Sequence, residues 1–285
     1  MGYDALGTDI DGDNSVALGY EALKTQESSS ANQSVMNVAV GAGAGQLLTT
    51  GIKNTFVGGQ CGQAGTITGA ENTGVGYYSL YTLAGGAYNT GIGKAALYLV
   101  AGGDYNTAVG FGAGAAVTSG DNNLFLGKDA GASGSPGGAI STGSNEIVLG
   151  DENITEAHIQ VDWTVASDER DKTDIEDLDV GLEFVNQLQP KTYRWDQRSL
   201  YGDEQDVSPD GTYKKDQLDV GFLAQDVDAL EEQLGFGKAD KKNLISSLSE
   251  DGQMYGLRYN KFVPMLVNAV QELSAEIEKL KKEQN

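Results

Sequence analysis

The chain has 285 residues, with 41 acidic side chains against 19 basic ones and a formal net charge of −22. Such a charge repels phosphate backbones and anionic lipid surfaces, so we expect no nucleic acid partner and no membrane insertion. A single cysteine and a single histidine exclude a disulfide framework, a structural zinc site and a histidine-based catalytic triad, and we expect neither a metal nor an organic cofactor.

The basic residues are unevenly distributed: four precede position 167 and fifteen follow it, while 15 acidic residues precede it and 26 follow it. Each part therefore carries a net charge of −11 (4 − 15 and 15 − 26), and neither is a basic arm. This change in composition predicts a glycine-rich repeat segment over residues 1–150, a connecting strand over residues 151–166, and a second domain over residues 167–285.

A five-residue unit recurs through the first part, with Asn or Ser, two small or apolar residues, an apolar residue and Gly. The intervals between its glycines are 22, 17, 18, 17, 17, 17 and 23, which gives a period of about 17 with insertions near residues 24–36 and 131–144 that we expect to be loops. The unit ends at Gly19, Gly41, Gly58, Gly76, Gly93, Gly110, Gly127 and Gly150.

Each apolar stretch is short, often β-branched and bounded by turn residues, which predicts a short strand. Glycines at fixed offsets suit positive φ or a close approach of neighbouring backbones. One strand and turn cannot bury an apolar face alone, so we expect successive units to stack into a β-solenoid.

The sequence GYDAL at residues 2–6 returns as GYEAL at residues 19–23. The chain thus begins inside a repeat, which leads us to expect a truncated gene product, with a natural short protein as the alternative.

Three other features of the repeats are candidate sites. The acidic run at residues 8–15 places carboxylates at Asp9, Asp11 and Asp13, but without the later Glu of an EF-hand we interpret it as a solvated turn. Cys61 is expected to be a small packed residue. Aromatic side chains are candidate stacking surfaces for a host glycan, although no distinctive carboxylate pair indicates glycosidase chemistry. These aromatics are Tyr77, Tyr78, Tyr88, Tyr98, Tyr105 and Phe111.

After the repeats, apolar residues alternate at Ile159, Val161, Trp163 and Val165, which predicts the connecting strand.

Ser167 then stands five residues before Lys172. A serine hydroxyl needs a base to become a nucleophile, and a lysine can serve when burial or a cationic neighbour, here Arg170, favours its neutral form. Taken alone, this spacing is far more typical of a charged turn over Asp168 to Asp171 than of a catalytic pair.

Four ordered motifs extend from there to the C-terminus: SDERDKTDI, LQPKTYRW, GFLAQDVDAL and YNKFVPMLVNAVQEL. Over residues 167–285 the chain resembles the intramolecular chaperone auto-processing domain at the ends of phage endosialidases, tail fibres and neck appendages. The resemblance implies a domain that trimerises, guides the folding of the preceding fibre and cuts itself off once. It places the cut between Ala166 and Ser167, with Ser167 as nucleophile and Lys172 as its base, acting within one chain or on a neighbouring one.

One position departs from the family pattern. Members usually carry Leu before the lysine, whereas this chain has Asp171. A carboxylate beside Lys172 favours the charged lysine, which works against removal of the Ser167 proton. The alternative is therefore a trimerisation chaperone that does not cleave.

The last motif predicts a helix at about residues 260–283, with Pro264 in its first turn. Its apolar residues follow steps of three and four, which is the pattern of the contact seam in a trimeric coiled coil. Glu272 is expected on an outer face of this helix. The alternative is an amphipathic helix packed on its own domain. Tyr193 and Trp195 are expected in the core, and GFLAQDV is expected to join a strand to a helix. The seam consists of Val263, Leu266, Val270, Leu273, Ile277 and Leu280.

The repeats themselves resemble the heads of trimeric autotransporter adhesins and related phage fibre modules. The combined interpretation is a mainly β, trimeric fibre of stacked short strands, followed by an α+β chaperone domain ending in a coiled-coil helix. It implies a phage tail fibre or tailspike segment, made in the host cytoplasm and carried on the virion. Its expected partners are two further copies of the chain, other tail proteins and a host receptor or glycan.

Overall fold

The computed structural model describes residues 2–9, 12–27, 33–202, 207–237 and 243–284. The chain forms two compact units, and each combines segments that are distant in the sequence. The first contains residues 1–155, 198–207 and 249–254, and the second contains residues 156–197, 208–248 and 255–285. Two segments that follow position 167 therefore belong to the repeat unit, a connection that the sequence did not indicate.

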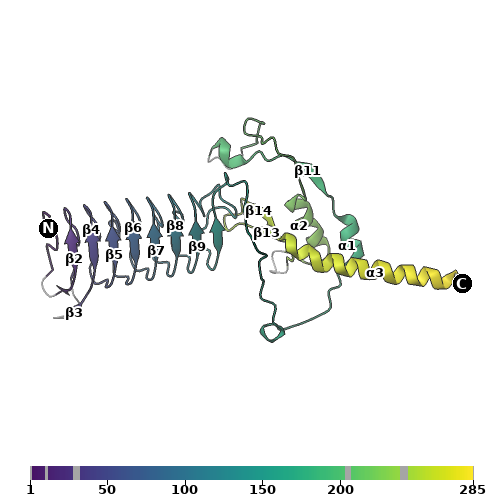
Figure 1. The fold of residues 1–285 in the computed structure, drawn as a ribbon, viewed down its shortest axis with the longest axis horizontal. Coiled ribbons are helices and arrows are strands. Elements are labelled where there is room, and N and C mark those ends of the chain that lie inside the picture. The colour runs from purple at the N-terminus through teal and green to yellow at the C-terminus, as the bar shows by residue number, and fades with distance from the viewer. Residues whose placement is uncertain (1, 10–11, 28–32, 203–206, 238–242, 285) are drawn as a thin grey trace. The chain divides into compact units, whose positions relative to one another are not determined.

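The first unit is a β-solenoid in which each repeat contributes one three-residue strand to a parallel eight-stranded sheet (Figure 1). Each strand from β4 onward immediately precedes a glycine of the repeat, and neighbours pair in register. The predicted solenoid is thus confirmed. The strands are β2 (Val16–Leu18), β4 (Val38–Val40), β5 (Thr55–Val57), β6 (Thr73–Val75), β7 (Thr90–Ile92), β8 (Thr107–Val109), β9 (Leu124–Leu126) and β10 (Ile147–Leu149). A separate pair, β1 (Gly12–Asp13) and β3 (Gln33–Ser34), is also parallel.

The middle residue of each strand points into the solenoid, and its size is matched by the residues of the facing turns. Phe56 is fully buried, and a Cβ on Gly45 or Gly62 would lie within 2.9 Å of its ring. Where the middle strand residue is Gly74, the side chains of Cys61 and Leu80 occupy the space instead. Large and small residues therefore alternate between strand and turn, which keeps the interior densely packed.

Cys61 belongs to this interior, as expected for a small packed residue. Its thiol is fully buried, and burial raises its pKa to about 12. The thiolate is the reactive form of cysteine, so this residue is chemically inert in the folded chain.

The repeat glycine is required by the stacking of the coils. At Gly93 the backbone has φ of +131°, and a Cβ there would lie 2.4 Å from the carbonyl oxygen of Gly110. The same close approach recurs in the other coils; for example, a Cβ on Gly76 would lie 2.5 Å from the carbonyl oxygen of Gly93. Only glycine tolerates both the conformation and the contact.

The repeat asparagine forms a buried hydrogen-bonded ladder along the solenoid. Asn89 Nδ2 donates to the carbonyl oxygen of Gly103 at 2.7 Å and to Asn72 Oδ1 at 3.1 Å, while Asn89 Oδ1 accepts from the backbone N–H of Asn106 at 3.0 Å. Each side chain thus connects adjacent coils and satisfies polar groups inside the solenoid. The members are Asn37, Asn54, Asn72, Asn89, Asn106 and Asn123.

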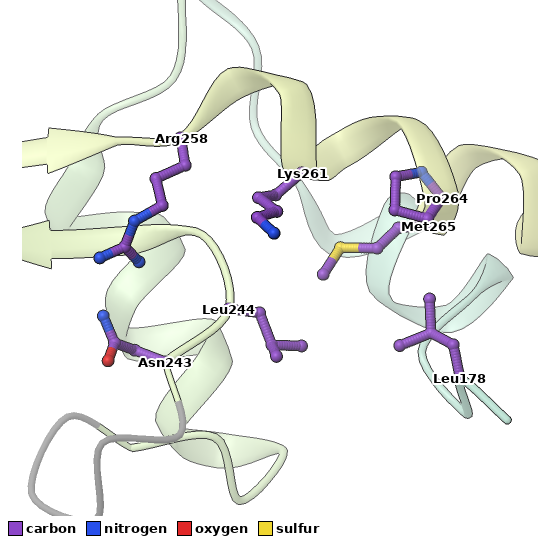
Figure 2. Close-up of a pocket in the computed structure, with 7 residues that line it drawn as sticks. All are labelled: Leu178, Asn243, Leu244, Arg258, Lys261, Pro264 and Met265. Carbon is purple, nitrogen blue, oxygen red and sulfur yellow. The ribbon is translucent and has the colours of Figure 1, made fainter. Parts of the chain in front are cut away.

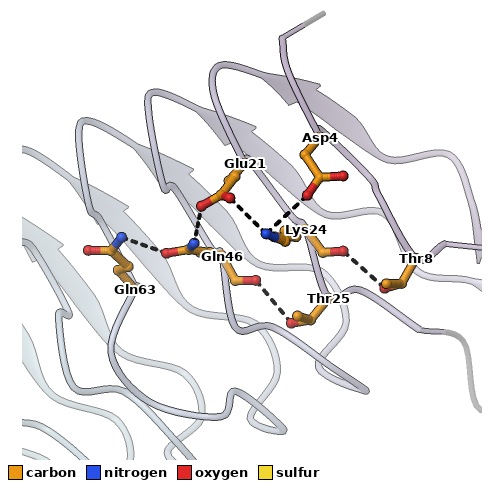
Figure 3. A network of polar contacts seen from close by, with 7 residues as sticks. All are labelled: Asp4, Thr8, Glu21, Lys24, Thr25, Gln46 and Gln63. Atoms are coloured by element: carbon orange, nitrogen blue, oxygen red, sulfur yellow. Dashed lines mark hydrogen bonds and ion pairs between the residues drawn. The ribbon is translucent and has the colours of Figure 1, made fainter.

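A second set of polar contacts crosses the first coils near the surface (Figure 3). Lys24 Nζ lies 2.7 Å from Glu21 Oε1 and 3.0 Å from Asp4 Oδ2. The hydrogen bond with Glu21 is the main cause that raises the pKa of Lys24. Gln46 Nε2 donates to Glu21, and Gln63 Nε2 donates to Gln46 Oε1 at 2.6 Å. These partly buried contacts follow the stacking direction, so they favour the same coil register as the core.

The second unit is a small α+β assembly with two antiparallel strand pairs and a long terminal helix. Its core joins α1, α2 and α3 through Phe184, Val227, Leu230 and Met265. The sequence GFLAQDV joins β12 to α2, as predicted. The elements are α1 (Leu182–Gln187), β11 (Lys191–Tyr193), β12 (Asp219–Gly221), α2 (Ala224–Gln233), β13 (Ser246–Leu248), β14 (Tyr255–Leu257) and α3 (Phe262–Glu283), with 3-10 turns η1 (Glu169–Asp171), η2 (Arg198–Tyr201, in the first unit) and η4 (Tyr259–Lys261).

Two sequence predictions for the region between residues 151 and 197 are wrong. Residues 151–166 form no strand, and the alternating side chains from Ile159 to Val165 are at least 50% exposed, because none of the described strands pairs with them. Trp195 is not in the core but 49% exposed, with its indole N–H donating to Asp219 at 3.0 Å. Trp195 lies two residues beyond the end of β11 and packs edge-on against Tyr193, with ring centroids 5.4 Å apart.

The terminal helix is present as predicted, with Pro264 in its first turn. Phe262, Met265 and Ala269 face the domain core and are buried. Glu272 was expected on an outer face but is half-buried, because its carboxylate accepts the backbone N–H of Leu182 at 2.7 Å and thereby caps α1. In contrast, the six seam residues are each between 44% and 63% exposed. The helix therefore packs on its own domain through a different face from the predicted seam.

Candidate functional site

The segment that carries the predicted catalytic pair is a short capped turn. Asp168 precedes η1 and its Oδ1 accepts the backbone N–H of Arg170 at 3.0 Å. The backbone N–H of Lys172 then donates to the carbonyl oxygen of Glu169 at 3.1 Å. This turn reverses the chain direction, so the side chain of Lys172 returns toward Ser167.

The turn brings the two predicted catalytic side chains into contact. Lys172 Nζ lies 2.8 Å from Ser167 Oγ and 3.2 Å from the carbonyl oxygen of Ser167. The first distance is within the range over which a general base removes a proton directly. Ala166 immediately precedes Ser167, so its carbonyl carbon is the electrophile nearest to that hydroxyl along the chain.

The predicted modulator Arg170 is engaged elsewhere. Its Nε donates to Asp168 Oδ1 at 3.0 Å, and its Nη2 donates to Asp168 Oδ2 at 2.7 Å. This guanidinium is the main cause that lowers the pKa of the Asp168 carboxyl. Because the two charges neutralise each other, Arg170 contributes little positive potential at Lys172.

Asp171, the second predicted modulator, contacts the turn through its backbone. Its N–H donates to the carbonyl oxygen of Asp168 at 3.2 Å. Among the ion pairs of the described residues, none joins the Asp171 carboxylate to Lys172. Any effect of Asp171 on Lys172 in this arrangement acts through space.

The whole segment from residue 156 to residue 177 is exposed to solvent in the single chain. Water stabilises the charged form of a lysine, whereas a general base must be neutral. The geometry of nucleophile and base is thus present, while the burial that would favour a neutral lysine must come from outside this segment.

Sequence reasoning missed two buried carboxylates in the second unit. Glu231 of α2 is 1% exposed and accepts three backbone N–H groups, from Leu244 and Ile245 at 2.7 Å and from Ser246 at 2.9 Å. Asp228 is 7% exposed and accepts the hydroxyl of Ser246 at 2.9 Å. Both acids therefore fix the start of β13 against α2, which is a structural role. The acidic run DVDALEE gave no sign of it, because the partners are backbone groups.

A shallow pocket of about 380 Å³ lies in the second unit (Figure 2). It combines apolar side chains with the cations of Arg258 and Lys261, but Arg258 also donates to the carbonyl oxygen of Ser246 at 3.1 Å. Among the described residues that line it there is no carboxylate, hydroxyl or thiol, so the pocket has no acidic side chain to pair with these cations. The lining residues are Leu178, Asn243, Leu244, Arg258, Lys261, Pro264 and Met265.

The predicted aromatic surface of the solenoid is partly assembled. Tyr88 and Tyr105 stack with parallel rings 4.8 Å apart and are 46% and 57% exposed. Phe111 lies below Lys94 Nζ at 5.5 Å, and Tyr78 packs edge-on against Tyr98 at 6.0 Å. The aromatics thus form separate clusters, of which the Tyr88 and Tyr105 stack presents the clearest open face.

The candidate calcium run includes Asp11, which lies outside the described residues. Elsewhere in the described part of the chain, no group of three or more acidic, histidine or cysteine side chains is arranged to hold a metal ion. None of the helices in the described ranges is both long enough and apolar enough to cross a bilayer.

No curated protein and no solved structure matches the chain. The peptidase family described as chaperone of endosialidase matches residues 167–236. The match begins at Ser167, includes Lys172 and extends through α2. It supports a phage fibre chaperone role for this part of the chain, and the peptidase name of the family suggests autoprocessing.

Proposed function

We propose that the chain is a segment of a phage tail fibre or tailspike whose C-terminal part assembles three chains, guides their folding and then cuts the bond between Ala166 and Ser167. The observation that carries this proposal is the 2.8 Å contact of Lys172 Nζ with Ser167 Oγ at the first residue of the matched region. The fibre would be made in the host cytoplasm and carried on the virion.

The proposed reaction needs only groups of this chain and water. Neutral Lys172 takes the proton of Ser167 Oγ, which attacks the carbonyl carbon of Ala166. The peptide C–N bond breaks, the amine of Ser167 takes up the proton, and an ester links Ala166 to Ser167 Oγ. Water then hydrolyses this ester, which leaves a carboxylate on Ala166 and restores the hydroxyl of Ser167. Each chain reacts once, so no external substrate is required.

Association of chains would supply the burial that the dyad lacks in one chain. Two apolar surfaces support association: the exposed α3 seam and the outward face of the solenoid sheet. On that sheet the last residue of every strand is Val, Ile or Leu, and Ile92 and Leu149 are 41% and 50% exposed. Strands repeat about every 4.8 Å along the axis. A second copy of the chain has the same repeat, so it matches this face over its whole length.

A chaperone is useful for such a fibre because its repeats are ambiguous in register. Three chains that slip by one repeat still form most of their contacts, so misaligned assemblies compete with the native one. A C-terminal trimer would fix the chain ends and raise the local concentration of the repeats. A later cut would make the finished fibre kinetically stable, since the assembly device could no longer act in reverse.

The trimer is tested by placing charges on the α3 seam of the full chain. The double substitution Val270→Asp and Leu273→Asp puts two carboxylates per chain at exposed seam positions, and we expect the trimer to dissociate because like charges would face each other in an apolar contact. Light scattering coupled to gel filtration measures the mass. The control Gln271→Asp adds a charge to an exposed residue beside the seam and should leave three chains; a parent of monomer mass would refute the trimer.

A second candidate function is glycan binding by the solenoid, favoured by the exposed Tyr88 and Tyr105 stack. A sugar ring could lie on the open face of either tyrosine. We expect Tyr105→Ala to weaken binding of the full chain on a glycan array by about fivefold or more, consistent with the loss of one aromatic contact. Tyr81→Ala, which removes a half-buried tyrosine that stacks on Tyr98, is the matched control. If the parent binds no glycan, the solenoid is a shaft only.

A further inference from the structure

The last coil of the solenoid has backbone groups that a following coil would normally satisfy. In the preceding coils, the N–H of Ala101 donates to the carbonyl oxygen of Thr118 at 3.0 Å, and the N–H of Thr118 donates to that of Ser141 at 2.9 Å. Ser141 is the next member of this series, and no further repeat follows to accept its N–H. The end of the solenoid therefore presents donors of the kind found at an open sheet edge.

Glu250 takes the place of the missing coil. Its carboxylate accepts the backbone N–H of Ser141 at 3.2 Å, of Thr142 at 3.1 Å and of Gly143 at 2.9 Å, and also the hydroxyl of Thr142. These residues are part of the ladder system, since the carbonyl oxygen of Gly143 accepts from Asn123 Nδ2 at 2.8 Å. One carboxylate thus caps three consecutive donors at the point where the asparagine ladder ends.

Further contacts hold the same segment in the first unit. Arg198 Nη2 donates to the carbonyl oxygen of Gln253 at 2.6 Å, which links the two late segments of that unit to each other. The insertion at residues 131–144 accommodates both of them through glycines. A Cβ on Gly134 would lie 3.1 Å from that of Ser199, and a Cβ on Gly138 would lie 3.1 Å from that of Ser249.

We propose that residues 249–254, the turn between β13 and β14, are the C-terminal cap of the solenoid and the docking element that keeps residues 167–285 bound after the chain is cut at Ala166. Glu250, Gln253 and Ser249 all follow the scissile bond in the sequence, whereas Ser141, Thr142 and Gly143 precede it. Cleavage therefore converts an internal cap into an interface between two polypeptides. The cap stands on contacts of the uncut chain; only its role after natural cleavage rests on the proposed function.

The test uses a cut that does not depend on self-cleavage. In full-length Ser167→Ala protein, a recognition site for a specific protease replaces the exposed residues 157–162, and the added protease makes the cut. We expect the two fragments to elute together on gel filtration at micromolar concentration. Their separation in this protein would refute the docking role, whereas an inactive dyad has no bearing on the result.

Glu250→Ala provides the direct comparison. Loss of the charge-assisted hydrogen bonds is expected to raise the dissociation constant of the fragments by ~10-fold or more and to speed amide exchange at Ser141, Thr142 and Gly143. Glu250→Gln keeps an acceptor oxygen, so its dissociation constant and its amide exchange rates should lie between those of Glu250→Ala and those of the parent. The control Glu232→Ala removes an exposed glutamate of α2 and should match the parent. Unchanged binding and unchanged exchange in Glu250→Ala would overturn the proposal.

Discussion

Ser167→Ala and Lys172→Ala are each expected to leave one intact chain in denaturing mass spectrometry, whereas the parent gives two fragments that meet at Ala166 and Ser167. Loss of the hydroxyl removes the nucleophile, and loss of the amine removes its base at 2.8 Å. Removal of a positioned general base lowers a rate by ~10²- to 10⁴-fold. A time course of the intact mass measures this loss.

The matched controls are Ser208→Ala and Lys214→Ala, which remove an exposed serine and an exposed lysine of the same domain. Both should cleave like the parent. Cleavage that persists in Ser167→Ala, or fragments that meet at another bond, would contradict the proposed site.

Asp171→Leu should accelerate cleavage. Removal of a carboxylate next to Lys172 disfavours the charged lysine and adds apolar surface at the position where the family resemblance implies Leu. The rate is read from the same mass time course. If the parent and Asp171→Leu both remain intact although trimeric, the chain is a chaperone that does not cleave, and the second of the two interpretations made from the sequence holds.

Asn89→Asp is expected to destabilise the centre of the solenoid strongly. The amide Nδ2 of Asn89 donates to two acceptors, the carbonyl oxygen of Gly103 and Asn72 Oδ1. A carboxylate of the same shape would place negative charge against both oxygens in a fully buried site. An uncompensated buried charge costs about 3–5 kcal/mol. Thermal unfolding followed by circular dichroism measures the loss.

The destabilisation of Asn89→Asp should depend on pH. Burial and two facing acceptors raise the folded pKa of the new carboxyl above its unfolded value of about 3.9. Between these two pKa values the folded state binds more protons than the unfolded state, so the stability of the variant falls as the pH rises. The loss of stability relative to the parent is therefore smallest in acid and complete at neutral pH. Asn145→Asp, at an exposed position whose Oδ1 accepts from Asn122 at 2.8 Å, is the control. Equal stability of both variants at neutral pH would contradict the ladder.

The two residues of the proposed catalytic pair are close in the sequence. A serine and a lysine five positions apart can meet through a single turn, and the capped η1 turn achieves this with local hydrogen bonds only. Local contacts also engage Arg170, which pairs with Asp168 two residues away, and its effect on Lys172 stays a prediction. The role of Asp171 stays a prediction.

The sequence by itself determined the solenoid, its period and the strand positions, because every coil repeats the same local pattern and each glycine or asparagine has the same task in each coil. It also determined the terminal helix and its apolar seam. The tertiary structure alone decided that the seam stays exposed, that the alternating residues from Ile159 to Val165 lack a partner strand, and that Glu250 caps Ser141 across 109 positions. These features depend on which distant backbone groups remain unsatisfied after folding, and a repeat period or a local charge pattern contains no information about that.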